Sequence, residues 1–408
     1  MKNVSTNKQT GAVSIFVVVF FMLLVTVVTV SFLRLMVADQ QQSSNNDLSG
    51  SALDSAQAGV EDAKRALLKY KTDCLSSPGV CATSANTINS TECNSALNSY
   101  FGNADVGGNG QTGEIKVQTS QSGNDSKLDQ AYTCVTINLE TPDYEGVATA
   151  NQSQLVPLMS SSTFDRVRVD WFSRDDVTSN AVSLSPVNAS GQPLYAQANW
   201  PVNRPSLMRA QLIQFAGTFT ESSFDTTSPD GANTNTATMF LYPTSQANIP
   251  ERVMTSYDQR KTSPTTNPQQ KDALTSPTAI SCKATLSSGG YACTSTLVLP
   301  QAIGASSAAD RKAFLRLTPF YNSTHFKVTL WNGPITAGSI VSNFKDVQPL
   351  IDATGRANDL FRRVQSRVNL YDTTFPYPEA AIDLTGDFCK DFAVTDTDFI
   401  AGSNTCTP

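Results

Sequence analysis

The amino-terminal apolar run is the feature that most limits how this chain can fold. Residues 12–33 read AVSIFVVVFFMLLVTVVTVSFL, with no charged residue, proline or glycine among them. Roughly 20 apolar residues in a helix are enough to cross the hydrocarbon core of a bilayer. The run is longer than the roughly 7–15-residue core of a secretory signal, and Met36 stands where a signal cleavage site needs a small residue. We therefore predict a transmembrane helix over residues 12–36.

A second helical pattern follows the apolar run. Small or apolar residues recur three or four residues apart, as they do along one face of a helix. This helix stripe consists of Leu48, Ala52, Ala56, Gly59, Ala63, Leu67 and Tyr70. Glu61 and Arg65 are four residues apart, in the order that favours an ion pair on a helix. We predict an amphipathic extension over residues 37–71, continuous with the transmembrane segment as a single helix from Ala12 to Tyr70.

The extension leaves two questions open. The polar run 39–46 could break the helix, which would separate a membrane anchor from a juxtamembrane helix. The helix stripe could hold the chain's own β-sheet, which we expect to be its larger use, or it could pack closely against helices of neighbouring chains.

Composition limits what the rest of the chain does. About 340 residues of the 408 follow the helix, enough for two ordinary domains or one large domain with insertions. The formal net charge is −6, which argues against nucleic acid as a partner, because a basic stripe is expected there. Abundant Ser, Thr and Asn favour β structure and turns over a helical enzyme.

All eight cysteines lie beyond the apolar run. An even number confined to this part of the chain is typical of disulfides in an oxidising compartment. Local pairing predicts Cys282–Cys293 across a hairpin and Cys389–Cys406 as a C-terminal loop. The remaining four allow three pairings, and their positions do not decide among them: Cys74, Cys81, Cys93 and Cys134. There is no C-x-x-C and a single His, so we predict no metal site.

The flanks of the apolar run predict its orientation. Lys2 and Lys8 precede the run and no acidic residue does. The positive-inside rule then keeps a short leader, residues 1–11, in the cytoplasm and sends the remainder outside, with membrane lipid as the first partner.

Two features of the amino terminus belong together. Gly11 ends a short basic leader and the apolar helix starts at once with Ala12, and residues 55–63 of the following helix read SAQAGVEDA. The first feature resembles a prepilin signal, and the second is similar to the ALxAAEAGxxxA-like segment of the type IV pilus minor pilins of the PilX kind. The resemblance to this family covers residues 8–70. It implies cleavage between Gly11 and Ala12 by a prepilin peptidase, and assembly with other pilin subunits.

Two positions depart from the pilin pattern. Phe16 occupies the fifth position of the expected mature chain, where major pilins carry Glu, and Thr10 precedes Gly11 where Lys or Arg is usual. Minor pilins of the PilX kind often lack this Glu as well. The resemblance therefore implies a minor or initiating subunit rather than the bulk filament subunit.

Beyond the helix the pattern is β-rich. We predict a Cys-containing connection with pilin-like strands over residues 72–160, a β-rich head over residues 161–380 and a disulfide-closed segment over residues 381–408. Within it, residues 72–113 are expected to be irregular, with one short helix at 95–101. Strands are predicted at 115–117, 132–139, 164–172, 207–215, 237–242, 291–299, 313–317, 325–331 and 361–371. Their alternation predicts an α+β fold with a large antiparallel, sandwich-like ectodomain.

The sequence offers little sign of catalysis. The common nucleophile, phosphate-loop, dinucleotide and metalloprotease motifs do not occur, and we predict no enzyme activity and no cofactor. His325 is expected to have a surface or packing role. The segments near Asp230 and Asp396 carry clustered side-chain oxygens. We predict that they form turns, with a Ca²⁺-binding site as the alternative. Trp171, Trp200 and Trp331 are expected to pack in the core, with a sugar-binding platform as the alternative.

Two functions remain in view at this point. The first is a PilX-like minor pilin, a structural subunit that primes or tips a type IV pilus and displays a β-rich head outward. The second is a single-pass, signal-anchored surface adhesin or binding protein that never enters a filament. In either case another cell surface is a candidate partner of the head, whose ligand the sequence does not identify.

Overall fold

The computed structural model has the expected α+β architecture, with a long apolar amino-terminal helix and a large β domain rich in antiparallel pairs. It describes residues 12–101, 113–117, 129–186, 197–215, 236–247, 249–254, 277–286, 290–304, 312–335, 339, 341–371, 392–394 and 399–401. The chain divides into two compact units. The first comprises Met1–Ile137 and Ile351–Ser366, and the second comprises Asn138–Leu350 and Arg367–Pro408.

The first unit is built on one uninterrupted helix. α1 (Ala12–Ser76) has 65 residues, which at 1.5 Å per residue gives a length of about 98 Å. The polar run 39–46 does not break it, because this run contains no proline or glycine and its three glutamines are good helix formers. The Glu61–Arg65 pair that we expected is replaced by two shorter-range pairs, Lys64–Glu61 at 2.6 Å and Arg65–Asp62 at 3.2 Å.

Two short helices follow α1 and contact it. α3 (Ser95–Phe101) coincides with the predicted short helix. α2 (Pro78–Ile88) was not predicted, because its segment is rich in Ser, Thr and Gly. Proline at the first position of a helix is pre-organised for helical φ and lacks only an N–H that would have no partner there, so Pro78 starts this helix instead of preventing it.

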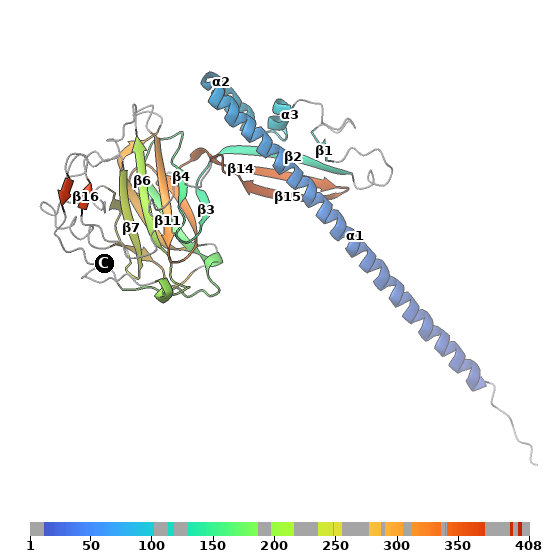
Figure 1. Ribbon diagram of the computed structural model, residues 1–408. Coiled ribbons are helices and arrows are strands. Elements are labelled where there is room, and N and C mark those ends of the chain that lie inside the picture. Colours follow the sequence, from blue (N-terminus) through green and yellow to red (C-terminus); the bar gives the residue numbers. More distant parts are fainter. Residues whose placement is uncertain are drawn as a thin grey trace, which may run out of the picture. The chain divides into compact units, whose positions relative to one another are not determined.

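A four-stranded sheet completes the first unit, in the order β1-β2-β14-β15. The strands are β1 (Ile115–Lys116), β2 (Gln130–Thr141), β14 (Phe344–Ala357) and β15 (Leu360–Arg367). The C-terminal half of α1 lies across this sheet (Figure 1). The Tyr132 hydroxyl in β2 donates a hydrogen bond to the Asp62 carboxylate on α1 at 2.8 Å, which links the helix to the sheet.

The second unit contains one hydrogen-bonded sheet. Within the described residues eleven strands join it, in the order β13-β12-β5-β10-β9-β7-β6-β11-β4, with β3 pairing β12 and β8 pairing β10. The strands are β3 (Tyr144–Ala148), β4 (Gln154–Pro157), β5 (Phe164–Ser173), β6 (Leu207–Phe215), β7 (Thr236–Thr244), β8 (Arg252–Val253), β9 (Thr278–Cys282), β10 (Tyr291–Ile303), β11 (Lys312–Phe320), β12 (Thr324–Trp331) and β13 (Val341–Ser342). The described part of the second unit also contains two short helices, η3 (Arg174–Asp176) and η4 (Gln197–Asn199). It further contains an antiparallel strand pair, β16 (Phe392–Val394) with β17 (Phe399–Ala401).

This sheet folds over on itself, which makes it sandwich-like. β11 and β12 are joined by only three residues, yet they stand near opposite ends of the strand order. The sheet must curl to bring those ends together, and one core then fills the space between its two halves. The expected alternation is present in β5, where Val167, Val169 and Trp171 are fully buried in this core. Two strand pairs, β7–β9 and β8–β10, are parallel, so the ectodomain is not purely antiparallel.

The division into units differs from the predicted segment boundaries. The second unit begins within β2, at residue 138, and the chain returns to the first unit within β14, at residue 351. Residues 138–160 therefore belong with the β-rich part, and residues 351–366 belong with the helix. Residues 138–350 of the second unit are thus inserted between two segments of the first, and residues 367–408 return to the second unit.

Candidate functional site

The amino-terminal half of α1 is an apolar helix that touches nothing else in the described chain. Every side chain from Ile15 to Asp47 is exposed, and Phe16 reaches 82% exposure. Burying one large apolar side chain is worth roughly 1.5–3 kcal/mol, so leaving this segment in water would cost on the order of tens of kcal/mol. The segment therefore requires lipid or other protein around it.

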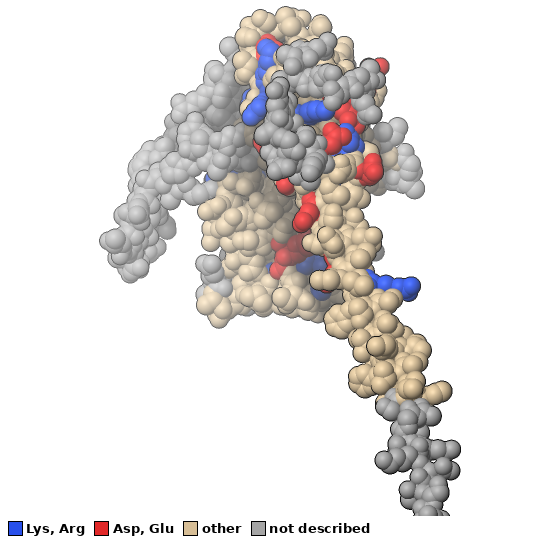
Figure 2. All heavy atoms as spheres, turned by 90° about the vertical axis from the view of Figure 1, so that its right-hand side faces the viewer, with Lys and Arg blue, Asp and Glu red and all other residues tan. Residues whose placement is uncertain are grey.

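The hydroxyl groups between residues 15 and 33 are satisfied within the helix. The hydroxyls of Thr26, Thr29 and Ser31 donate to carbonyls three or four residues earlier, at 2.7–2.8 Å. Arg34 is the one charged residue between residues 12 and 38. Figure 2 shows the lower part of the helix almost entirely uncharged, whereas basic and acidic side chains gather higher up. The described helix is long and apolar enough to cross a membrane, with a mean hydropathy of 2.9 in its most apolar window.

The helix stripe holds the chain's own sheet. Ala52, Ala56, Gly59, Ala63, Leu67 and Tyr70 are buried and Leu48 is half-buried. A Cβ added to Gly59 would lie 2.8 Å from a methyl carbon of Val135 in β2. A Cβ added to Gly355 in β14 would overlap the backbone of α1 at Ala52 and Ala56. α1 and β14 therefore contact each other through their backbones. This half of α1 is packed against the sheet of the first unit.

The predicted cleavage position lies at the edge of what the structure describes. Gly11 lies outside the described residues, and α1 starts at Ala12. The residues between Ala12 and Phe16 are thus already helical, and Phe16 is the most exposed large apolar residue of the helix.

Three disulfides occur in the described residues. Cys74–Cys81 links the end of α1 to α2, and Cys93–Cys134 links the segment before α3 to β2. This is one of the three pairings that the sequence left open. Cys282–Cys293, the pair that spacing predicts, joins residues directly opposite each other on β9 and β10. Cys389 and Cys406 lie outside the described residues.

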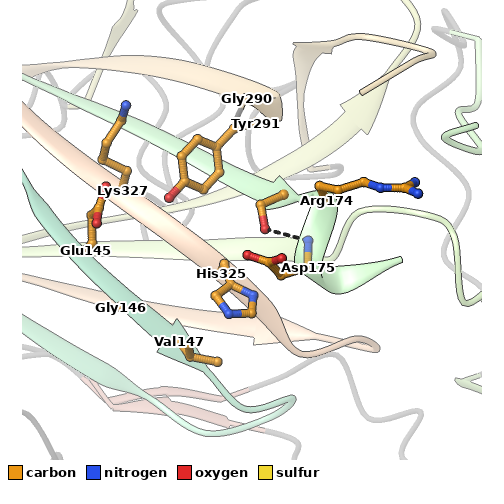
Figure 3. Close-up of a pocket in the computed structure, with 10 residues that line it drawn as sticks. Glu145, Gly146, Val147, Arg174, Asp175, Gly290, Tyr291, His325 and Lys327 are labelled. Carbon is orange, nitrogen blue, oxygen red and sulfur yellow. Dashed lines mark hydrogen bonds between the residues drawn. The ribbon is translucent and has the colours of Figure 1, made fainter. Parts of the chain in front are cut away.

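A second candidate site is a pocket on the outer face of the second unit (Figure 3). Its volume is about 640 Å³, and it lies where β3, β12, β5 and β10 run side by side and η3 follows β5. Its charged and aromatic lining consists of Glu145, Arg174, Asp175, Tyr291, His325 and Lys327. Sequence analysis assigned these residues no shared role, because they lie on four separate stretches of chain.

His325 is oriented by a buried carboxylate. Its Nδ1 lies 2.7 Å from Oδ1 of Asp176, and its backbone N–H donates to the same carboxylate at 3.0 Å. Asp176 is almost fully buried, with 6% of its side chain exposed, and it also accepts from the backbone N–H of Ser173. Because Asp176 holds Nδ1, the other ring nitrogen, Nε2, is the one available to a ligand.

Tyr291 and Lys327 form the opposite part of the lining. The Lys327 ammonium lies 5.3 Å from the centre of the Tyr291 ring, and Lys327 is directly opposite Glu145 on β3. Burial raises the pKa of Tyr291 to about 12, and nearby carboxylates, Glu145 and Asp170 first among them, add to the shift. Its hydroxyl therefore stays protonated at neutral pH and can donate a hydrogen bond.

The other residues that the sequence singled out do not form a site in the described chain. Trp171 is buried in the core and donates from Nε1 to the Ser206 carbonyl at 3.1 Å. Trp200 stacks on Tyr321 at 4.1 Å, and Trp331 lies half-buried on β12, so the three tryptophans do not share one surface. The predicted turns near Asp230 and Asp396 lie outside the described residues.

No protein-family model matches the chain, and no curated protein matches it either. One apolar amino-terminal helix together with disulfides is typical of a single-pass membrane protein or a secreted protein.

Proposed function

We propose that this chain is a minor pilin of the PilX kind, which primes or tips a type IV pilus and displays a β-rich head outward. The observation that carries the proposal is that the two halves of α1 have different surroundings. Its C-terminal half is fixed to the sheet of the first unit, whereas its amino-terminal half is apolar, exposed and free to take other neighbours. A subunit that passes from the membrane into a filament needs this arrangement.

The physical steps follow from the helix. As a monomer, the uncharged segment is solvated by lipid. On assembly, the same apolar surface leaves lipid for the helices of other subunits, so packing changes while no charge has to cross the membrane. In this proposal the leader 1–11 stays cytoplasmic, and a prepilin peptidase removes it between Gly11 and Ala12.

Phe16 suits an initiating role. Major pilins carry Glu at this position, which meets the amino terminus of a neighbour. A Glu in lipid is costly until it is paired, and pairing draws the subunit into the filament. Because Phe16 is apolar, this subunit has less drive to join an existing filament and is better suited to begin one.

The same residue favours the second candidate, a signal-anchored adhesin that stays in the membrane. Phe16 and Thr10 both depart from the pilin pattern, and an apolar helix that is never trimmed serves equally well as a permanent anchor. In both proposals the protein is structural or adhesive, and we assign it no catalytic role.

Mass spectrometry of the amino terminus separates the two candidates. In cells with an active prepilin peptidase, the pilin proposal expects a mature chain that begins at Ala12 and carries an N-methyl group. Gly11→Val should block this trimming, whereas Gly50→Val, the same change at an exposed glycine of α1, should leave it intact. A native chain that retains residues 1–11 would favour the permanent anchor.

A further inference from the structure

The pocket of the second unit has a lining that restricts what can bind there. Among its described residues, Glu145 and Asp175 are carboxylates, and Lys327 and Arg174 are cations. Figure 3 draws these side chains around the pocket, with Arg174 extending away from the others. The Arg174 guanidinium donates to the Thr178 carbonyl at 3.5 Å, so it contributes less to the interior than Lys327 does.

Charged ligands fit this lining poorly. An anion attracted to Lys327 would meet Glu145 directly opposite it on the neighbouring strand, and Asp175 nearby in the lining. An organic cation attracted to the Tyr291 ring would find the Lys327 ammonium already placed against that ring. A purely apolar ligand would remove these charged groups from water without replacing their hydrogen bonds, which is costly.

A neutral polyhydroxyl ligand can form hydrogen bonds with both the acidic and the basic groups of the lining. Each hydroxyl both donates and accepts, so neighbouring hydroxyls can donate to Glu145 or Asp175 and accept from Lys327. The Tyr291 hydroxyl adds a donor, and Nε2 of His325 adds a further polar contact. The apolar side of a sugar ring, made of C–H groups, can pack on Val147, whose side chain is 52% exposed in the pocket lining.

We propose that this pocket binds a neutral sugar residue, such as those exposed on the glycans of a cell surface. The pocket lies wholly within the second unit. It would serve a pilus subunit and a permanently anchored protein alike, so the proposal stands independently of filament assembly.

The test uses the full chain in a detergent without a sugar headgroup, such as lauryldimethylamine oxide. Saturation-transfer NMR is recorded with glucose, galactose, mannose and N-acetylglucosamine, and with methyl phosphate and choline as charged probes, whose C–H protons the experiment can detect. We expect transfer to at least one neutral sugar and none to the charged probes. Transfer to no neutral sugar, or to a charged probe alone, overturns the proposal.

Variants then locate the binding site. Glu145→Gln and Lys327→Met each remove one charge-assisted hydrogen bond, so each should weaken sugar binding about tenfold or more. Lys283→Met makes the same change at an exposed lysine outside the pocket and should leave the affinity within about twofold. Val147→Trp fills the pocket without removing a charge and should abolish transfer. Circular dichroism verifies that each variant is folded; folded pocket variants that bind sugar as the parent does would overturn the proposal.

Discussion

Gly355 of β14 lies directly against the backbone of α1 at Ala52. A Cβ at this position would overlap the Ala52 carbonyl oxygen and the Ala56 amide nitrogen, which are backbone atoms that cannot rotate aside. We therefore expect Gly355→Ala to force α1 away from the sheet, at a cost of about 3 kcal/mol. Thermal unfolding of the detergent-solubilised chain should show a clearly lower midpoint, and hydrogen exchange should become faster in β14.

Gly50→Ala is the matched control for this change. Gly50 is exposed on α1 and has nothing within 4 Å of its would-be Cβ. Because alanine is favoured over glycine within a helix by about 1 kcal/mol, this variant should be slightly more stable than the parent. Equal midpoints for the Gly355 and Gly50 variants would contradict the backbone contact.

Gly59 of α1 tests the contact between this helix and β2. A Cβ here would press on the side chains of Val135 and Tyr132, which can shift more readily than backbone. The helix also gains about 1 kcal/mol when alanine replaces glycine. Gly59→Ala should thus destabilise the first unit less than Gly355→Ala does, by the same thermal measurement. The reverse order would show that side chains, not backbone, set the distance between α1 and the sheet.

Arg356 is predicted to contribute more to the stability of the folded chain than the exposed Arg363 does. The Arg356 guanidinium, 14% exposed, bonds Glu114 and Asp129, each at 2.8 Å. Arg356→Met would leave these two carboxylates without this partner, at a cost of about 1–3 kcal/mol. Arg363 is 66% exposed and its ion pair with Asp352 is screened by water, so Arg363→Met should destabilise the chain much less than Arg356→Met does. Similar losses in urea unfolding of the two variants would contradict this ranking.

Tyr291 should make the stability of the second unit depend on pH at the alkaline end. Its pKa is about 12 in the folded chain and about 10 in the unfolded chain, because burial disfavours the phenolate. The folded state therefore holds the proton more tightly, and the contribution is complete below pH ~10 and lost as pH rises towards ~12.

The measurement is a difference titration. Ultraviolet absorbance of the parent minus that of Tyr291→Phe isolates this phenol, and its midpoint should lie near pH 12. Between pH ~10 and ~12 the parent should lose stability more steeply than the variant. A midpoint near pH 10 would contradict the burial of the Tyr291 hydroxyl and its position near Glu145 and Asp170.

Local patterns were enough to predict the elements of this fold whose burial repeats along the chain. The apolar run and the helix stripe predicted α1, although its end at Ser76 lies beyond the predicted Tyr70. Strict alternation predicted β5 almost residue for residue. β14 was missed, although it carries the contact with α1, because Pro349 and Gly355 both argue against a strand when they are considered locally.

The pocket could not be predicted in the same way. Glu145, Tyr291 and Lys327 each lie on a different strand, and the sequence of any one of these strands does not indicate its neighbours in the sheet. They meet because β3, β12, β5 and β10 are adjacent in the sheet, an order set by long-range packing rather than by the pattern of any one strand. His325 was expected to have a surface or packing role, and its contact with Asp176 depends on the same pairing.

The most direct test of the central claim is to look for this chain in sheared, purified type IV pili. Peptide mass spectrometry of the filaments should detect it at a low level relative to the major subunit, with an amino terminus at Ala12. Filaments that contain none of it, from cells whose membranes retain the chain with residues 1–11 attached, would contradict the pilin account.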